Sequence, residues 1–181
     1  FSFDTIKDFD NHISLSVSNY PIISDLIGSI STYFIEPETN VYDIGCSTGK
    51  LLKELSARVL AVNVSFVGYD ISDNLLPTET TFGDVNFFKR DVTDPTIKFY
   101  NTNLILSVFT LQFIPRVKRP ALVQKIADSL NEGGAFIICE KFYPEDSRVQ
   151  DIFNFSHYDS KRKYFSDDEI LDKQYTLRQI M

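Results

Sequence analysis

The chain has 181 residues, of which 43% are hydrophobic and 24% are charged, and it carries a net charge of −7. This composition is typical of one globular domain, spanning 1–181, and excludes a disordered segment, while the acidic balance does not favour direct binding to nucleic acid. No apolar run approaches the roughly 20 residues of a transmembrane helix, so we expect a domain that acts on a small molecule and has no membrane partner.

The first half of the chain alternates helical and strand patterns. Apolar residues recur at helical spacing after Pro21, which stands at a tolerated first-turn position. A short apolar run then ends at Gly45, which is typical of a buried strand followed by a tight loop. The predicted elements of this half are a helix over 21–35, a strand over Val41–Ile44, a helix from about Thr48 and a strand over Val64–Tyr69.

The second half continues the alternation after Ser72–Val85, a turn-rich stretch in which the expected helix is reduced to a turn or two. The glycines of Asn131–Gly134 predict a C-terminal cap for the helix before them. Ser166–Glu169 is typical of a capping box and predicts the start of a last helix. The other predicted elements of this half are strands over Asn86–Lys89, Asn103–Val108 and Ala135–Cys139 and a helix over Arg119–Leu130.

Strands that alternate with helices at this spacing predict an α/β fold, a doubly wound and mostly parallel sheet with helices on both faces. In such sheets the ligand lies beyond the carboxyl ends of the strands. The residues that follow the predicted strands are Gly45–Gly49, Asp70, Asp91, Val108 and Glu140.

The glycine turn in Asp43–Lys50 follows the first predicted strand, and three ligand types compete for it. We reject a phosphate-binding loop, because only three residues separate Gly45 from Gly49 and no hydroxyl residue follows the lysine. A dinucleotide turn has a glycine where Ser47 stands, and the carboxylate of Asp43 would repel a pyrophosphate. S-adenosylmethionine instead carries a cationic amino group and a sulfonium, which the same carboxylate attracts.

Two further aspartates complete this prediction. Asp70 ends the second strand, where a carboxylate can accept hydrogen bonds from both ribose hydroxyls of an adenosyl group. Asp91 ends the third strand and is placed to contact the adenine amino group, while Ile71 and Val92 offer apolar walls for the ring. With Asp43 they follow three successive strands, so we predict an S-adenosylmethionine site at this edge of the sheet.

Metal and disulfide chemistry are not expected. Cys46 and Cys139 are far apart at the edges of apolar runs, and the only histidines are His12 and His157. This is neither a disulfide framework nor the spacing of a zinc site. Reduced thiols of this kind predict a cytoplasmic protein.

Several short segments together carry a family resemblance. They are Ser16–Tyr20, Val41–Ser47, Phe109–Phe113, Gly133–Ala135, Glu140–Phe142 and Glu145–Asp146. Through them, from about Phe3 to Met181, the chain resembles the carboxy-S-adenosyl-L-methionine synthases of the tRNA wobble-uridine modification pathway. The resemblance implies the Rossmann-like fold of class I methyltransferases, with S-adenosylmethionine or its carboxylated form as cofactor. It also implies that prephenate loses carbon dioxide, which the methyl carbon of the cofactor captures as a sulfonium ylide.

The resemblance also implies which residues bind the cofactor, although it assigns no catalytic residue. These cofactor-binding residues are Tyr20, Gly45, Cys46, Ser47, Asp70, Ile71, Asp91 and Val92. Val108 occupies a further cofactor position, at which the family has an asparagine. Gln174 stands near the position of a family arginine that contacts the carboxylate added to the cofactor. Glutamine lacks the charge of that arginine. Arg178 lies four residues further along the predicted helix, on the same face, and is the hypothetical replacement.

Three functions stay open from the sequence. The first is carboxy-S-adenosylmethionine synthesis, the second is methyl transfer to a small molecule or nucleic acid, and the third is a non-catalytic partner that holds the cofactor. The family continues past Met181 with further sheet-forming sequence, so we expect this chain to lack the last strands of the sheet and to expose an edge that favours a homodimer.

Overall fold

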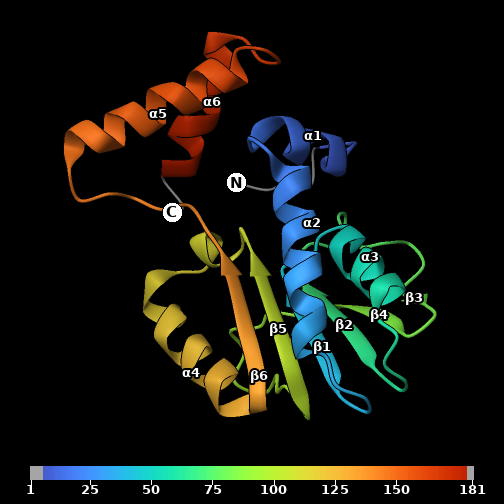
Figure 1. Cartoon of the computed structure of the whole chain (residues 1–181). Helices are drawn as coiled ribbons and strands as arrows, with labels where there is room; N and C mark the ends of the chain where they lie inside the picture. The colour runs from blue at the N-terminus through green and yellow to red at the C-terminus, as the bar shows by residue number, and fades with distance from the viewer. Residues whose placement is uncertain (1–5, 179–181) are drawn as a thin grey trace.

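A computed structural model of the chain describes residues 6–178. Helices and strands alternate through its middle, as the sequence predicts, and three helices stand outside this alternation (Figure 1). The elements in chain order are α1 (Phe9–Ser16), α2 (Tyr20–Ser31), η1 (Thr32–Phe34), β1 (Asn40–Ile44), α3 (Lys50–Arg58), β2 (Ser65–Asp70), β3 (Thr81–Phe82), β4 (Val85–Lys89), β5 (Thr102–Val108), η2 (Leu111–Phe113), η3 (Arg116–Lys118), α4 (Arg119–Ser129), β6 (Leu130–Cys139), α5 (Ser147–Lys161) and α6 (Asp167–Arg178).

The strands form one sheet of six strands in the order β3-β4-β2-β1-β5-β6. Every neighbouring pair is parallel except β3 and β4, which are antiparallel. The chain order reverses at β1, which pairs with β2 on one side and with β5 on the other. This reversal is the switch point at which ligands bind in open α/β sheets, so the prediction of a doubly wound, mostly parallel sheet is confirmed.

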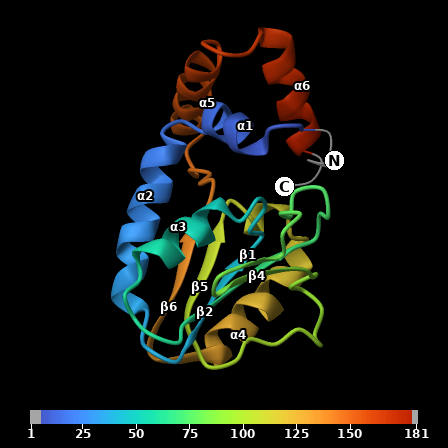
Figure 2. The ribbon, with the colours of Figure 1, turned by 90° about the vertical axis from the view of Figure 1, so that its right-hand side faces the viewer.

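Helices cover both faces of this sheet (Figures 1 and 2). Because successive side chains of a strand point to opposite faces, β1 contributes to two separate cores. Val41 packs in one cluster with Leu52 and Leu55 of α3, whereas Ile44 packs in the other with Leu122 of α4. All five side chains are at most 2% exposed, so these two cores hold the carboxyl edge of the sheet in a fixed position.

The predicted glycine cap after the fourth helix is wrong in its position. Helix α4 ends at Ser129, and Leu130 follows it in extended conformation, so β6 already begins there. Gly133 has a φ of +79° inside that strand, where the pairing with β5 shifts register. The glycines therefore serve an irregularity of the strand, and a glycine with this dihedral is expected at such a bulge. The stretch Ser72–Val85 forms turns, as its composition predicts, and also the short strand β3, which the sequence patterns do not predict.

Helices α1, α5 and α6 lie together beyond the carboxyl ends of the strands (Figure 2). The predicted capping box of α6 is confirmed, because the carboxylate of Glu169 accepts hydrogen bonds from the backbone N and the hydroxyl of Ser166, both at 2.8 Å. Ser18 donates to the hydroxyl of Ser160 at 2.9 Å, which ties α5 to the chain between α1 and α2. Among the described helices none is both long enough and apolar enough to span a membrane.

Candidate cofactor site

The glycine turn closes directly over the end of β1. Gly45 has a φ of +77°, and its N–H donates to the carbonyl of Tyr69 on β2 at 2.7 Å. A Cβ at this position would lie 2.2 Å from the hydroxyl oxygen of Thr110, which follows β5. Both the positive φ and the close approach of Thr110 require glycine here. The ends of β1, β2 and β5 therefore meet at this turn.

The next residues of the turn are held by Asp70, at the end of β2. One carboxylate oxygen accepts a hydrogen bond from the backbone N–H of Ser47, and the other accepts one from that of Ser72, both at 2.9 Å. Ser47 itself has a φ of +52°, an uncommon conformation for a residue with a side chain. Each carboxylate oxygen has a second lone pair, so Asp70 can still accept hydrogen bonds from ribose hydroxyls. Asp70 thus lies directly beside the glycine turn, and its contact with the ribose stays a prediction.

Asp43 is the most deeply buried acidic group at this edge, with an exposed fraction of 3%. No described residue donates a hydrogen bond to its carboxylate. Burial, and then the charge of Asp70, raise the pKa of Asp43 to about 7. Two carboxyl groups in such a place repel each other, and a cation brought between the glycine turn and Asp43 relieves that repulsion. The site therefore favours a positively charged ligand group and disfavours a phosphate.

Tyr20, at the start of α2, faces the same carboxylates. Burial, followed by the charges of Asp43 and Asp10, raises the pKa of its phenol to about 12, so the hydroxyl keeps its proton. Its ring lies 6.1 Å, centroid to centroid, from that of Phe109, which has a φ of +56° directly after β5. Val108 ends β5 and packs against the core on the side of α2 and α3. The structure thus gathers Tyr20 and Val108 with the glycine turn.

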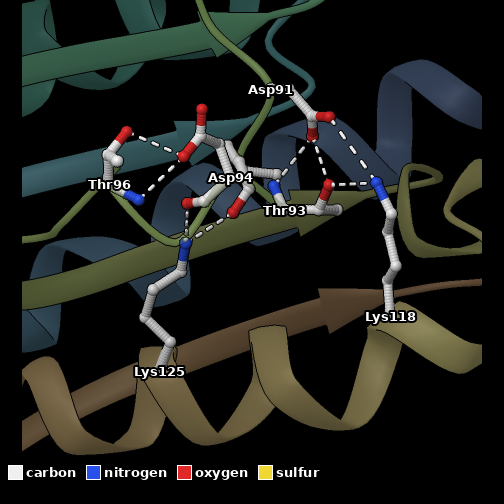
Figure 3. A network of polar contacts seen from close by, with 7 residues as sticks. Asp91, Thr93, Asp94, Thr96, Lys118 and Lys125 are labelled. Carbon is white, nitrogen blue, oxygen red and sulfur yellow. Dashed lines mark hydrogen bonds and ion pairs between the residues drawn. The ribbon is translucent and has the colours of Figure 1, made fainter.

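Asp91 lies two residues after the end of β4, and its carboxylate points toward its own loop (Figure 3). Thr93 donates to it from the backbone N at 2.8 Å and from the hydroxyl at 2.7 Å, and these bonds lower the pKa of Asp91. Val92 is 6% exposed in the core beside α4, and its carbonyl accepts a hydrogen bond from Lys125 at 2.6 Å. Ile71, by contrast, is 69% exposed. Of the two expected apolar walls, only Ile71 therefore offers its side chain to a ligand from the surface.

Lys125, on α4, fixes the loop that carries Asp91. Besides Val92, its ammonium group donates to the carbonyl of Asp94 at 3.0 Å (Figure 3). It also donates to the carbonyl of Ile97 at 3.1 Å. Charge-assisted bonds of this kind are stronger than neutral ones. Lys118 adds a hydrogen bond to the hydroxyl of Thr93 at 3.0 Å, so two lysines hold the loop after β4 to the α4 side of the sheet.

The two residues predicted to meet a carboxylate lie on α6, apart from the glycine turn. Gln174 accepts a short hydrogen bond from the hydroxyl of Tyr158 on α5 and lines a cavity between these helices. The side chain of Arg178 lies outside the described residues, so its role stays a prediction.

One residue of the site, Asp10, escapes the sequence patterns, whereas Glu140 lies after the last strand, where the sequence places it. Asp10, on α1, accepts a hydrogen bond from the hydroxyl of Thr48 at 2.7 Å and so ties that helix to the glycine turn. Helix α1 has only eight residues, too few for a clear apolar periodicity in the sequence. Glu140, after β6, accepts a hydrogen bond from the backbone N of Leu111 at 2.6 Å, and burial raises its pKa. It fixes the loop after β5 beside Gly45.

Comparison with known proteins agrees with this geometry. Residues 41–134 match the family model described as a methyltransferase domain. The chain is 33% identical, over 98% of its length and 78% of the relative, to the carboxy-S-adenosyl-L-methionine synthase of Staphylococcus epidermidis. It is 31% identical, over its whole length and 78% of the relative, to the synthase of the same name from Colwellia psychrerythraea.

Solved structures show the same fold at low identity. YcgJ from Bacillus subtilis superposes with a TM-score of 0.59 at 17% identity, over 75% of this chain and 57% of that one. CalS10 from Micromonospora echinaspora, an amino pentose methyltransferase solved with bound S-adenosylmethionine, superposes with a TM-score of 0.56 at 15% identity, over 76% of this chain and 57% of that one. The chain therefore has the same Rossmann-like α/β fold as these proteins.

Proposed function

The chain belongs to the carboxy-S-adenosyl-L-methionine synthase family and carries its methyltransferase domain, and from this premise we propose that it makes carboxy-S-adenosylmethionine from S-adenosylmethionine and prephenate. It is an S-adenosylmethionine-dependent enzyme of the transferase class. The observation that carries the cofactor half of the proposal is Asp43, a buried carboxyl group beside a glycine turn. The carboxylation part of the proposal is supported by the relatives, which are named carboxy-S-adenosyl-L-methionine synthases.

We assign the cofactor residues by their place at the carboxyl edge of the sheet. Asp43 faces the amino group and the sulfonium, both cationic, and Gly45, Cys46 and Ser47 let the backbone approach the amino acid part. Asp70 accepts hydrogen bonds from the ribose hydroxyls while it holds Ser47. The remaining cofactor contacts proposed are the side chains of Tyr20, Ile71, Asp91 and Val108 and the backbone of Val92.

The proposed reaction needs a carbon nucleophile at the methyl group. Loss of carbon dioxide makes the ring of prephenate aromatic and expels its hydroxide. This hydroxide takes a proton from the methyl group, and the resulting ylide carbon forms the new bond to carbon dioxide. The enzyme's part is to hold both molecules in reach of each other and to keep water out, which is a contribution of positioning. Helices α1, α5 and α6 lie beyond the strand ends, on the side where such a cover is needed (Figure 2).

The direct test is an assay of the purified chain with both substrates. Liquid chromatography and mass spectrometry are expected to detect S-adenosylmethionine that has gained one carboxyl group, only when prephenate is present. Asp43→Asn is the matched variant, because it keeps the shape of the side chain and removes its charge. A wild-type chain that leaves S-adenosylmethionine unchanged at saturating prephenate would contradict the proposal.

A second candidate is methyl transfer to another acceptor, and two residues favour it. Val108 has no side-chain hydrogen-bonding group where the family has an asparagine, and Gln174 lacks the charge of the family's arginine. Both changes weaken the recognition of a carboxylated cofactor relative to the plain one. Release of S-adenosylhomocysteine with an added acceptor and no prephenate would support this function. A chain inactive in both assays but competent in cofactor binding would be a non-catalytic partner.

We also propose a homodimer that works in the cytoplasm and serves tRNA modification through its product. β6 forms one end of the described sheet, and α5 exposes the large apolar side chains of Ile152, Phe153 and Phe155 by 55–60%. Such surfaces are typical of protein interfaces. Both cysteines are free thiols, which suits a reducing compartment. Sedimentation velocity is expected to give the mass of two chains, and a Phe153→Glu variant the mass of one.

A further inference from the structure

Residues of α5 and α6 line a cavity of about 150 Å³. These two helices lie at the end of the molecule to which the strands point (Figure 2). The lining of the cavity joins two lysines to aromatic and aliphatic side chains. The residues that matter for the argument are Lys141, Tyr143, His157, Tyr158, Lys161 and Ile170. Lys141 stands two residues after β6, so the chain runs from the sheet's carboxyl edge directly into the cavity wall.

Positive charges in and beside this cavity act on one another. The pKa of Lys161 is lowered by burial and then by the charges of Lys173 and Lys141. Burial, followed by Lys161 and Lys141, lowers the pKa of His157 to about 4. His12, on α1, has its pKa lowered by burial and by Lys173 and Lys161. Every one of these pairwise charge effects is a repulsion, so three lysines share one positive field.

Neither cavity lysine, Lys141 or Lys161, forms an ion pair with another of the described residues. Lys141 instead lies over the ring of Tyr143, with its Nζ 4.8 Å from the centroid. Lys161 is half-buried and Lys141 is exposed. Like charges held close together, one of them half-buried, destabilise the unliganded protein, and an anion that binds between them reduces that cost. The chain as a whole has a net charge of −7, so this cluster of positive charge is opposite in sign to the net charge of the protein.

The rest of the lining indicates what kind of anion fits. Tyr143 and Tyr158 add aromatic faces, and Ile170 is 4% exposed behind them. A bare inorganic ion gains nothing from such walls, whereas an organic acid with a compact hydrocarbon ring buries that ring against them. Two separate lysines further match a ligand with two carboxylates better than a ligand with one.

We propose that the cavity between α5 and α6 binds the carboxylates of the acid substrate, and that Lys141 and Lys161 hold them. This inference rests on the proposed function and names the part of the chain that recognises prephenate, a cyclic dicarboxylate. Gln174 lines the same cavity, so the lysines supply a positive charge where the family's arginine is absent. They are binding residues for the acid and lie apart from the glycine turn that holds the cofactor.

The test is a calorimetric titration of prephenate into the full chain saturated with S-adenosylhomocysteine, which has no methyl group and so allows no turnover. Lys161→Gln and Lys141→Gln are each expected to weaken prephenate binding about tenfold or more, the loss of one charge-assisted bond. Lys163→Gln is the control, because Lys163 is an exposed lysine two residues beyond Lys161 and lines no part of the cavity. Its prephenate affinity is expected to equal that of the wild type, and all three variants are expected to bind S-adenosylhomocysteine normally.

A thermal scan without ligand separates binding from a structural role. Removing one of several repelling charges is expected to leave the melting temperature of Lys161→Gln equal to or above that of the wild type, and a loss of several degrees would overturn the assignment. Equal prephenate affinity in the wild type and both cavity variants would overturn it too, even in an active enzyme. Phosphate that binds as tightly as prephenate would show a general anion site and reject the dicarboxylate. Lysine-dependent prephenate binding without carboxylated product would instead contradict only the proposed reaction.

Discussion

The titration of Asp43 gives a quantitative prediction for cofactor binding. Its pKa of about 7 in the unliganded protein means that half of the molecules carry a protonated Asp43 at neutral pH. If the cationic cofactor needs the ionised form, its dissociation constant rises as pH falls below 7. At pH 5 about one molecule in a hundred is ionised, so binding is expected to be roughly fiftyfold weaker than at pH 7.

The assay is isothermal titration calorimetry with S-adenosylmethionine between pH 5 and pH 7, a range in which the amino group of the cofactor stays protonated. Tyr20 and Cys46 face Asp43, but burial raises the pKa of both, so they keep their protons throughout the range. Asp70 is the remaining acidic neighbour. Asp43→Asn is therefore the control: it is expected to bind weakly and without the pH slope that the wild type shows.

The sign of the stability effect follows from the same pKa. The value for Asp43 is raised from 3.8 to about 7, so the folded protein holds this proton more tightly than the unfolded chain does. The unliganded wild type is thus expected to lose stability as pH rises from about 4 to about 7, and the loss is absent in Asp43→Asn. A wild-type dissociation constant that is flat between pH 5 and pH 7 would refute this reasoning.

Three further predictions concern the turn, the loop and the last helix. Gly45→Ala is expected to abolish measurable cofactor binding in calorimetry, whereas Gly83→Ala, with a similar positive φ but open space around its Cβ, is expected to bind normally. Lys125→Met removes three hydrogen bonds to the loop after β4 and is expected to lower the free energy of unfolding by about 1 to 3 kcal/mol in urea denaturation. The control variant Lys98→Met, at an exposed lysine, is expected to change this free energy little. Equal free energies of unfolding for the two variants would show that Lys125 does not hold the loop. Arg178→Ala is expected to weaken the binding of carboxy-S-adenosylmethionine about tenfold if Arg178 meets the carboxylate, and an unchanged affinity would exclude it.

Local patterns were sufficient for the sheet and the glycine turn. The strand at Val41–Ile44 and the helix after it have apolar side chains at the spacing that their burial requires, and Gly45 is the residue that a positive φ demands. The same rule failed at Gly133, because a positive φ is equally compatible with a helix cap and with an irregular strand. Only the pairing of β6 with β5 decides between them.

The cover over the strand ends could not be predicted in the same way. Helix α1 has only eight residues, and α5 carries apolar side chains, such as Ile152 and Phe153, that stay exposed and form no core-facing stripe. Lys141 and Lys161 are twenty positions apart and come together only because α5 folds back beside α6. A cluster of charge that depends on tertiary packing has no local pattern, whereas the three aspartates of the cofactor site lie at or just beyond the carboxyl ends of three neighbouring parallel strands.

The most direct measurement is the mass spectrum of the small molecule released from the purified chain on denaturation. Asp43 and Asp70 beside the glycine turn predict S-adenosylmethionine, in its plain or its carboxylated form. A nucleotide that carries a phosphate would contradict the account, because its charge would have to lie against a buried carboxyl group.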